Sequence, residues 1–353
     1  MYTKRIAVDL AKNVFQLAEC HRSDKIVSRK RLNRSAFYKT LTLLTEPTEI
    51  IFEACGTAHY WGRVVQRLGH KATLLHARHV SPFRRGNKTD RNDCDAILNA
   101  SRSIDIKPIP VKTELQQHIQ HLHCIRELWK QNRLQRINLL RGIFREQGFD
   151  CPLGRAAFLK IAPIIADEPV MQPIAILVSQ LLAEIKNCTE SLDACENTIA
   201  NLLINDNVIS RIDDVSGIGL LSASAFVAAV GTPERFKNGR VLSAWLGMTP
   251  KEYSSGNSRK LGSISRAGNT YVRTLLIHCA RSALQSAKRC AAKTPEKLTH
   301  LQQWAIQLSD RIGYNKATVA LANKLVRICW SVWKHERRFD GNFIPTSTIQ
   351  TAG

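Results

Sequence analysis

The sequence predicts a mixed α/β domain at the N-terminus, then a region of long, coiled-coil-like helices, then a mainly α-helical C-terminal domain. Three observations support this division. Short apolar, β-prone runs alternate with helical patterns up to about residue 105, apolar residues then recur at helical spacing, and small-residue and amphipathic helical segments follow. The expected domains are 1–108, 109–206 and 207–338, followed by a flexible tail at 339–353.

The N-terminal pattern starts with three strands and continues with alternating helices and strands. The expected strands are 5–10, 14–20, 25–30, 49–53 and 71–76, and the expected helices are 35–44, 59–68 and 93–102. This order is that of a ribonuclease-H-like domain. Two prolines at 106–110 indicate an exit linker.

The middle region has no motif of its own. Its apolar periodicity predicts two long helices that fold back on each other or pair with another chain, which makes it the candidate oligomerisation arm. Basic residues recur along the first of these helices and suit either a nucleic-acid backbone or a solvated face: Arg126, Lys130, Arg133, Arg136, Arg141 and Arg145. Trp304, Trp330 and Trp333 are expected in the core or at an interface rather than as base-stacking platforms.

Charge points to a polyanionic partner. The 353 residues include 51 Lys+Arg against 29 Asp+Glu, a formal net charge of +22. Nucleic acid is favoured because each neutralised phosphate releases counterions. An anionic membrane is the alternative, but the sequence has no run of about 18 apolar residues. We expect a cytoplasmic protein without a signal peptide, whose 10 scattered cysteines are free thiols.

Four acidic residues in the first third form the main candidate site. Asp9 and Glu53 each close an apolar, strand-like run, and Asp90 and Asp93 stand one helical turn apart where a helix should begin. Converging carboxylates make a hard, oxygen-rich site suited to Mg²⁺. The alternative is that the first two are ordinary strand-end acids and the second two belong to a helix cap and first turn.

Two weaker features lie in the third region. Gly217 and Gly219, in Gly-Ile-Gly before a small-residue helix, resemble a helix-hairpin-helix whose backbone N–H groups hold a DNA phosphate. Residues 251–265 are expected to form a polar loop. Taken alone, a serine in such a loop is a surface residue.

The acidic motifs carry a family resemblance. The segments Val8-Asp9-Leu10-Ala11-Lys12, Phe52-Glu53-Ala54-Cys55-Gly56 and Lys88-Thr89-Asp90-Arg91-Asn92-Asp93 resemble the three acidic motifs of the DEDD insertion-sequence transposases. That family has a RuvC-like N-terminal domain and includes pilin-gene invertases and bridge-RNA-guided recombinases. One departure is Cys94-Asp95, where many members have Ala-Glu, and it leaves Asp95 as a rival ligand.

A second signature follows in the expected order. The segments Met248-Thr249-Pro250, Ser255-Gly256 and Gly262-Ser263-Ile264-Ser265-Arg266-Ala267-Gly268-Asn269 resemble the C-terminal signature of the same transposases. In that family the serine before glycine is the nucleophile, which implies Ser255, with Ser254 as its neighbouring rival. Candidate nucleic-acid contacts are Lys88, Arg91, Arg259, Lys260 and Arg266.

The resemblance implies a transposase that acts as a site-specific DNA recombinase. Asp9, Glu53, Asp90 and Asp93 would bind Mg²⁺, with Mn²⁺ able to substitute, and Ser255 would form a phosphoserine bond to DNA. Implied partners are element-end and target DNA, a structured noncoding guide RNA, and further copies of the chain as a dimer that assembles to a tetramer. The implied location is the nucleoid of a prokaryote.

Two other functions remain open from the sequence. One is a RuvC-like nuclease or Holliday-junction resolvase that uses water and needs no Ser255. The other is a non-enzymatic nucleic-acid-binding protein, against which the presence of all four acids argues.

Overall fold

The computed structural model describes residues 4–21, 25–87, 89–256 and 258–343. Its internal contacts divide the chain into two compact units, Met1–Gln117 and His118–Gly353. Each unit has its own buried clusters of apolar side chains.

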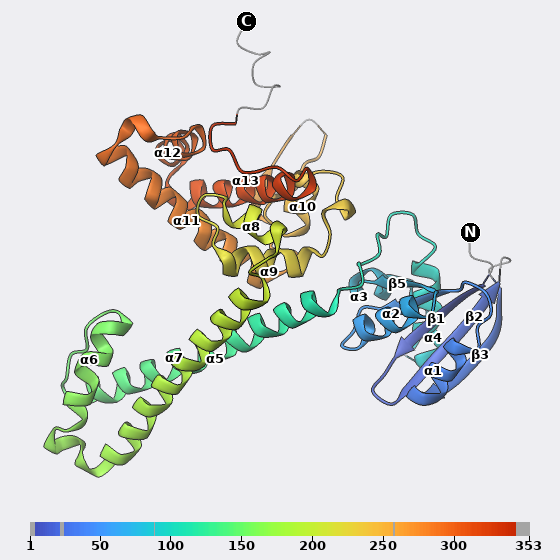
Figure 1. Ribbon diagram of the computed structural model, residues 1–353, viewed down its shortest axis with the longest axis horizontal. Helices are drawn as coiled ribbons and strands as arrows, with labels where there is room; N and C mark the ends of the chain where they lie inside the picture. Colours follow the sequence, from blue (N-terminus) through green and yellow to red (C-terminus); the bar gives the residue numbers. More distant parts are fainter. Residues whose placement is uncertain (1–3, 22–24, 88, 257, 344–353) are drawn as a thin grey trace, which may run out of the picture. The chain divides into compact units, whose positions relative to one another are not determined.

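The first unit is built on a five-stranded sheet with the strand order β3-β2-β1-β4-β5. The β1–β2 and β2–β3 pairs are antiparallel, whereas β1–β4 and β4–β5 are parallel. The predicted mixed α/β region is confirmed, and each predicted strand forms with its ends moved by at most three residues. The strands are β1 (Lys4–Leu10), β2 (Val14–His21), β3 (Ile26–Asn33), β4 (Glu49–Glu53) and β5 (Lys71–Leu75) (Figure 1).

Helices cover both faces of this sheet. On one face Phe15 packs edge-to-face against Phe37 of α1 and Trp61 of α2, with ring centroids 5.2 and 5.3 Å apart. On the other face Ala7 and Ile51 pack against α4. Burial on both faces explains why the central strands are continuous apolar runs. The helices are α1 (Arg34–Thr42), α2 (Ala58–Arg67), α3 (Ala77–Val80), η1 (Ser81–Phe83) and α4 (Asp90–Ala100).

The first unit extends beyond the predicted boundary at residue 108. The Ile109 N–H donates to the Leu74 carbonyl at 2.7 Å, which attaches the chain to β5. The Lys112 N–H donates to His59 Nδ1 at 3.2 Å, which attaches it to α2. The segment expected to be an exit linker is therefore held against the sheet and its covering helix.

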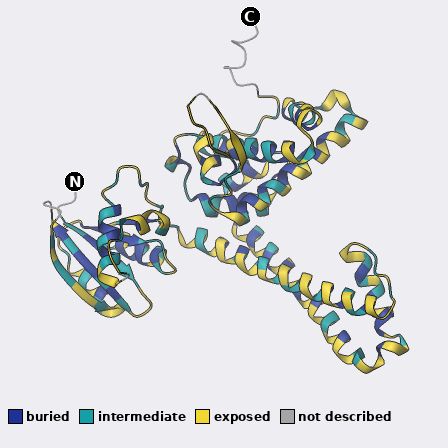
Figure 2. Ribbon diagram, turned by 180° about the vertical axis from the view of Figure 1, so that it is seen from behind, coloured by how far each residue is buried: buried dark blue, intermediate teal, exposed yellow. Residues whose placement is uncertain are grey.

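Two long helices of the middle region fold back on each other, one of the two arrangements expected. They are α5 (Glu114–Glu146) and α7 (Ala175–Leu202), connected through α6 (Arg155–Ala166) and η2 (Pro169–Ile174) (Figures 1 and 2). Phe144 of α5 and Phe158 of α6 pack together in the buried apolar cluster that connects the two long helices. In the described part of the chain no single helix is long and apolar enough to span a membrane. Taken together, α6 and the helical segment 169–202 are long and apolar enough, but the two are bent by 93° relative to each other.

Most of the basic residues along α5 have partners inside the arm. Arg126 contacts Glu196 at 2.7 Å and Arg136 pairs with Glu184, and both acids belong to α7. The other contacts are Lys130 with Glu127, Arg133 with Thr189, and Arg141 with the Gly154 carbonyl. These pairs favour the interpretation of a solvated, internally neutralised face over a backbone-binding stripe.

The C-terminal part of the second unit is a helical body with a short hairpin. Its largest buried cluster includes Phe226, Leu276 and Leu325 from α9, α11 and α13. The predicted small-residue helix at 220–230 forms as α9. The elements are α8 (Asn207–Asp213), α9 (Leu220–Val230), η3 (Pro233–Arg235), α10 (Gly239–Trp245), β6 (Pro250–Glu252), β7 (Leu261–Ile264), α11 (Thr270–Lys293), η4 (Pro295–Lys297), α12 (His300–Ile312) and α13 (Tyr314–Lys334).

The first residues of the predicted flexible tail are held in place. The Leu301 N–H donates to the Gly341 carbonyl at 3.0 Å, and the His300 N–H donates to Asn342 Oδ1 at 3.2 Å. Residues 339–343 therefore lie against the start of α12 rather than loose in solvent. The rest of the predicted tail, 344–353, lies outside the described residues.

A buried histidine connects the arm to the helical body. His123 of α5 is 4% exposed, its Nδ1 is 3.0 Å from the Tyr271 hydroxyl, and its Nε2 is 3.0 Å from Ser224 Oγ. Burial, with a smaller contribution from the charge of Arg126, lowers the pKa of His123 to about 4. His123 is therefore neutral in the folded protein at neutral pH.

We expect His123 to make the second unit less stable as the pH falls. The unfolded chain protonates this histidine near pH 6.5, whereas the folded chain resists protonation down to about pH 4. The free energy of unfolding should drop by about 2 kcal/mol more between pH 7 and pH 5 in the native chain than in His123→Gln. Urea unfolding followed by tryptophan fluorescence measures this, because five of the six tryptophans lie in the second unit. An equal drop in both proteins would contradict the assignment.

Candidate functional site

Two of the predicted acids stand at adjacent strand ends. Asp9 is the last residue but one of β1, and Glu53 is the last residue of β4. These strands are parallel with Val8 opposite Phe52, so Asp9 and Glu53 follow side by side at the same edge of the sheet. Side chains alternate along a strand, and both acids share the parity of the residues that pack against α4. Both carboxylates therefore lie on the α4 face.

The other two acids begin the helix that covers this face. Asp90 and Asp93 occupy the first turn of α4, and the hydroxyl of the N-cap residue Thr89 accepts a backbone hydrogen bond from that turn at 3.3 Å. The buried Cys94 donates its S–H to the Gln16 carbonyl at 3.1 Å, which attaches the start of α4 to β2. Burial raises the pKa of Cys94 to about 12, so the departure from Ala adds an unreactive thiol.

The four carboxylates influence one another electrostatically. Partial burial is the largest cause that raises the pKa of Asp9 to about 6, followed by the negative charges of Asp93, Asp90 and Glu53, while Arg84 acts in the opposite direction. This is the pattern expected of several acids that share one site. The structure thus brings all four sequence-predicted acids into one neighbourhood of the first unit.

Arg84 is a site residue that the sequence analysis missed. Its Nε lies 2.5 Å from Asp93 Oδ1. Neither atom has a hydrogen-bond partner, so the contact is an ion pair and not an aligned hydrogen bond. The available signal was the basic pair Arg84-Arg85 before Gly86, shortly ahead of the second pair of acids.

The chemistry of the site suits a divalent cation, although the carboxylates are not preformed as a cage. In the described part of the chain no group of three or more His, Cys, Asp or Glu side chains is arranged to hold an ion. The donors are nonetheless all hard carboxylate oxygens, and Asp93 Oδ1 is buried without a hydrogen-bond donor. A bound cation would give that oxygen a ligand beside its ion pair with Arg84, and it would offset the repulsion that, after burial, raises the pKa of Asp9.

Asp95, the rival acid on α4, is directed elsewhere. Its Oδ1 lies 2.8 Å from Arg29 Nη2, and its Oδ2 accepts a hydrogen bond from the same nitrogen at 3.0 Å. Arg29 belongs to β3, on the far side of β2 from β1. Asp95 therefore makes a structural ion pair.

The expected polar loop that carries the candidate serine is instead a β-hairpin. Beyond β6 and β7, the Tyr253 N–H donates to the Lys260 carbonyl at 2.9 Å. Ser255 and Ser258 then exchange both backbone hydrogen bonds, at 3.1 and 3.0 Å, and Gly256 turns the chain with φ 55°. The prediction missed these strands because they are short and lack apolar alternation. Ser255 therefore lies at the exposed tip of an ordered hairpin.

The two candidate serines differ in what their hydroxyls contact. Ser254 Oγ donates to Glu252 Oε1 at 2.7 Å, and Arg259 Nε donates to the same oxygen at 3.2 Å. The Ser254 hydrogen bond is the main cause that lowers the pKa of Glu252. Toward the residues that the structure describes, the Ser255 hydroxyl makes no hydrogen bond. Ser255 is therefore the serine that remains available to a ligand.

The base of the hairpin is tightly packed. Gly247 and Gly268 both have positive φ, 72° and 74°. A Cβ at Gly247 would lie 2.3 Å from the Ala267 nitrogen, and a Cβ at Gly268 would lie 2.1 Å from the Trp245 carbonyl oxygen. Arg273, 7% exposed, donates to the Ala267 carbonyl at 2.8 Å. These close contacts fix how the hairpin leaves the helical body.

The Gly-Ile-Gly segment has a packing explanation. A Cβ at Gly217 would lie 2.7 Å from both the Ala283 Cβ and the Cys279 carbonyl oxygen, so this glycine permits close contact with α11. Gly219 is the N-cap residue of α9, with open space where a side chain would be. Of the two glycines, Gly219 alone stands at the start of a helix with open space beside it, as a contact to a DNA phosphate would require.

The remaining predicted nucleic-acid contacts are surface cations in both units. Arg91 is exposed in the first turn of α4, beside the acids. Arg259, Lys260 and Arg266 are exposed on and after the hairpin. Lys88 lies outside the described residues.

Comparison with known proteins identifies transposases over nearly the whole chain. Residues 209–294 match the family described as "Transposase IS116/IS110/IS902 family", and residues 6–147 match the DEDD domain of IS110-type elements, described as "Transposase". The chain is 36% identical to a probable family 20 transposase of Pseudomonas aeruginosa, over 95% of this chain and 98% of that protein. It is 34% identical to the transposase for insertion sequence element IS1111A of Coxiella burnetii, over 95% and 91%.

We expect Asp9→Asn to stabilise the first unit when a chelator is present. The substitution removes one of four mutually repelling charges, and after allowance for solvent screening the gain should be about 1 kcal/mol at pH 7. Hydrogen exchange of the β1 and β4 amides in the full chain measures it. The matched control is Asp95→Asn on α4, which should lower stability because it breaks the pair with Arg29. A loss of protection in Asp9→Asn would contradict the described repulsion.

We also expect the two ends of the hairpin to respond differently to an added methyl group. Gly268→Ala should cost about 3 kcal/mol or more, because positive φ combines with a clash against backbone. Gly256→Ala also has positive φ but meets nothing within 4 Å, and it should cost only about 1 kcal/mol. Urea unfolding of the full chain distinguishes the two, and equal costs would show that contact at the base is unimportant.

Proposed function

The chain belongs to the IS116/IS110/IS902 family of transposases and is a DNA transposase, and on that premise we propose that it recombines DNA through a phosphoserine bond at Ser255. The observation that carries the proposal is the meeting of four carboxylates, from two parallel strand ends and one helix start, in a strongly basic chain. The second support is the Ser255 hydroxyl, which lies at an exposed hairpin tip and makes no hydrogen bond to the described residues.

We assign the first unit a RuvC-like fold of the ribonuclease-H type. The support is its sheet order, with two parallel strands whose ends carry acids and a helix that brings two more to the same face. Asp9, Glu53, Asp90 and Asp93 are the proposed Mg²⁺ ligands, with Mn²⁺ able to substitute. When bound, such a cation neutralises charge on a phosphate and on the acids themselves.

The proposed chemistry keeps the number of phosphodiester bonds constant. Ser255 Oγ attacks a DNA phosphorus atom, and a P–Oγ bond forms while the P–O bond to the departing strand breaks. The serine proton ends on the departing strand's hydroxyl. A hydroxyl of the partner strand then attacks the phosphoserine, joins the new strand and returns the proton to Ser255. Because the phosphodiester energy is retained, the reaction needs no ATP.

Exposed cations would hold the DNA during these steps. Arg91 and Lys88 flank the acids in sequence, and Arg259, Lys260 and Arg266 flank Ser255. Arg84, already paired with Asp93, would limit repulsion between the acids and an incoming phosphate. Each cation would act by charge and leave the choice of sequence to other groups.

We propose that the arm joins copies of the chain into dimers that assemble to tetramers. Its distal part exposes large apolar side chains: Leu153 at 95%, Ile164 at 64%, Ile176 at 77% and Leu177 at 60%. Large apolar side chains exposed to this degree are typical of association surfaces. Four DNA strands must be cut and rejoined, which fits four serines. Assembly would then join the acids and Ser255 in one reacting complex.

We also propose that a structured noncoding RNA selects the DNA sites. The net charge of +22 suits RNA as well as DNA, and the sequence has no recognisable base-reading helix. The alternative function is a RuvC-like nuclease or junction resolvase, in which water replaces Ser255. A covalent protein–DNA product separates the two.

We expect a denaturation-resistant protein–DNA adduct when the full chain meets Mg²⁺, element-end DNA and RNA from the element's flanks. Ser255→Ala and Asp9→Ala should each abolish the adduct. Ser254→Ala is the matched control and should retain it, because its hydroxyl contacts Glu252. Denaturing electrophoresis of labelled DNA measures the product.

Three outcomes of this experiment would contradict parts of the proposal. An adduct that persists in Ser255→Ala would remove the nucleophile assignment. Cleaved DNA without adduct would favour the water-using nuclease. Equal recombination after RNase treatment would remove the guide RNA.

A further inference from the structure

A large groove lies in the second unit beside the base of the β6–β7 hairpin that carries Ser255, which we call the serine hairpin. It has a volume of about 1220 Å³ and is bounded by α12, α13 and residues 337–343, and we call it the α12–α13 groove. Pro250 of β6 and Ile264 of β7 contribute to its wall. Asn323 of α13 donates to the Met248 carbonyl at 3.1 Å, which attaches the groove to the segment that enters the hairpin.

In the part of the chain that the structure describes, the cations of the groove have no carboxylate partners. Lys316, Lys324 and Arg327 lie along α13, and Arg337 and Arg338 continue the series after the helix. None of them takes part in an ion pair among the residues that the structure describes. Asp340 is the acid of the lining. The groove therefore has a large excess of positive charge and suits an anionic ligand.

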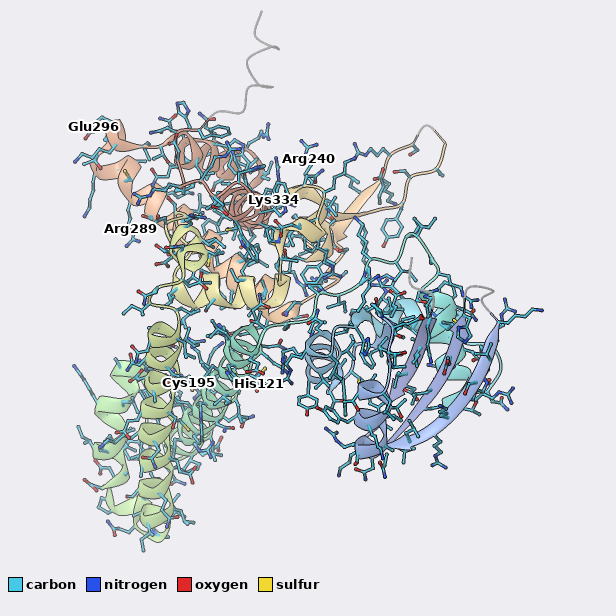
Figure 3. All side chains as sticks on the ribbon, turned by 45° about the vertical axis from the view of Figure 1, so that its right-hand side comes forward. His121, Cys195, Arg240, Arg289, Glu296 and Lys334 are labelled. Carbon is cyan, nitrogen blue, oxygen red and sulfur yellow. The ribbon has the colours of Figure 1, made fainter. Side chains whose placement is uncertain are left out.

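This excess charge is held against apolar surface. Lys324 Nζ lies 4.0 Å from the ring centroid of Trp304, a cation–π contact across α12 and α13. Burial lowers the pKa of both Lys324 and Arg327, and nearby cations add to the effect, Arg327 on Lys324 and Arg240 on Arg327 (Figure 3 labels Arg240). Cations that repel one another and are partly desolvated gain most from a bound anion.

The remaining basic side chain of α13, which lies outside the groove lining, is already neutralised. Lys334, labelled in Figure 3, ends α13 and contacts Glu234 at 2.9 Å. Trp330 on the same helix donates its indole N–H to the Pro233 carbonyl at 3.1 Å. The three cations of α13 without an ion pair to the described residues thus all line the groove.

We propose that the α12–α13 groove binds the unpaired DNA strand that adjoins the phosphodiester attacked by Ser255. Phosphates would contact Lys316, Lys324 and Arg327, which span about 16 Å of helix, enough for more than one phosphate. Unstacked bases would pack on the apolar wall that includes Trp304 and Phe343. This inference rests on the proposed function, because it places the strand next to the serine hairpin.

A single strand fits this lining better than a duplex. A duplex presents phosphates to a protein but keeps its bases stacked inside, so it would leave the apolar wall unused. An unpaired strand presents phosphates and base faces together, which matches cations that line an aromatic and aliphatic surface. Recombination needs strands to separate from their partners before they exchange, so such a strand arises in the proposed reaction.

The test measures DNA binding without chemistry. In the Ser255→Ala background, binding of a labelled single-stranded DNA should weaken about tenfold at 0.15 M salt in the double variant Lys316→Gln, Lys324→Gln. The slope of log affinity against log salt should fall by about 1.4, or roughly 0.7 per lost phosphate contact. The matched control is Lys297→Gln, Lys334→Gln, which removes two lysines outside the groove and should leave the slope unchanged.

A second measurement locates the strand. A single-stranded DNA carrying 5-iodo-2′-deoxyuridine should crosslink on illumination to peptides that contain Trp304 or Phe343. Equal salt slopes in the groove and control variants, or crosslinks only elsewhere, would overturn the proposal. So would crosslinking by the same sequence as RNA and not as DNA. A further result would assign the groove to the chain's own C-terminus. In that case, removal of residues 344–353 would tighten DNA binding, and substitution of the groove lysines would leave the salt slope unchanged.

Failure of this inference is distinguishable from failure of the proposed function. If Ser255 is not the nucleophile, the adduct is absent or persists in Ser255→Ala, but the groove variants still change the salt slope. If the groove is not the strand site, the adduct forms and the slope is unchanged.

Discussion

The parallel pairing of β1 with β4 is the constraint on which the acidic site depends. The register that sets Val8 opposite Phe52 also sets Asp9 beside Glu53 at one sheet edge. A slip of one residue would turn either carboxylate to the opposite face, where α1 and α2 pack, and would expose apolar side chains. The buried apolar residues of both strands oppose that slip. The packing energy of the sheet therefore holds two carboxylates together despite their repulsion, and partial burial together with the charges of the neighbouring acids raises the pKa of Asp9.

The serine hairpin depends on a different kind of constraint. The acids are positioned by buried apolar side chains, whereas Ser255 lies at the end of two short polar strands with little to bury. Its geometry is set at the base, where two glycines allow backbone to approach backbone and the buried Arg273 satisfies a carbonyl oxygen. The tip is thereby exposed and yet attached to a rigid body. Such an arrangement suits the role proposed for Ser255, in which the side chain must reach a phosphate on a large substrate.

The positive charge of the chain serves more than one purpose. Along α5, Arg126 and Arg136 pair with acids of α7, and Arg133 and Arg141 donate to neutral oxygens of the arm, so these side chains help to hold the arm together. Around the hairpin and in the α12–α13 groove, the cations lack such partners in the described residues or share one acid. A net charge of +22 therefore does not spread evenly over potential binding surfaces. The distribution favours contact with nucleic acid on the helical body rather than along the arm.

The sequence by itself determined the order of strands and helices in the first unit, the two long helices, and the four acids as a group, because apolar periodicity and strand-end position are local properties. It also singled out Ser255 through the motif around it. Only the tertiary structure distinguished each candidate site residue from a neighbour of the same type. Asp95 forms an ion pair with Arg29, and the Ser254 hydroxyl donates to Glu252, so both side chains already have partners. It also revealed Arg84, the hairpin and the groove. These depend on contacts between residues distant in sequence or on strands too short and polar to leave a periodic pattern.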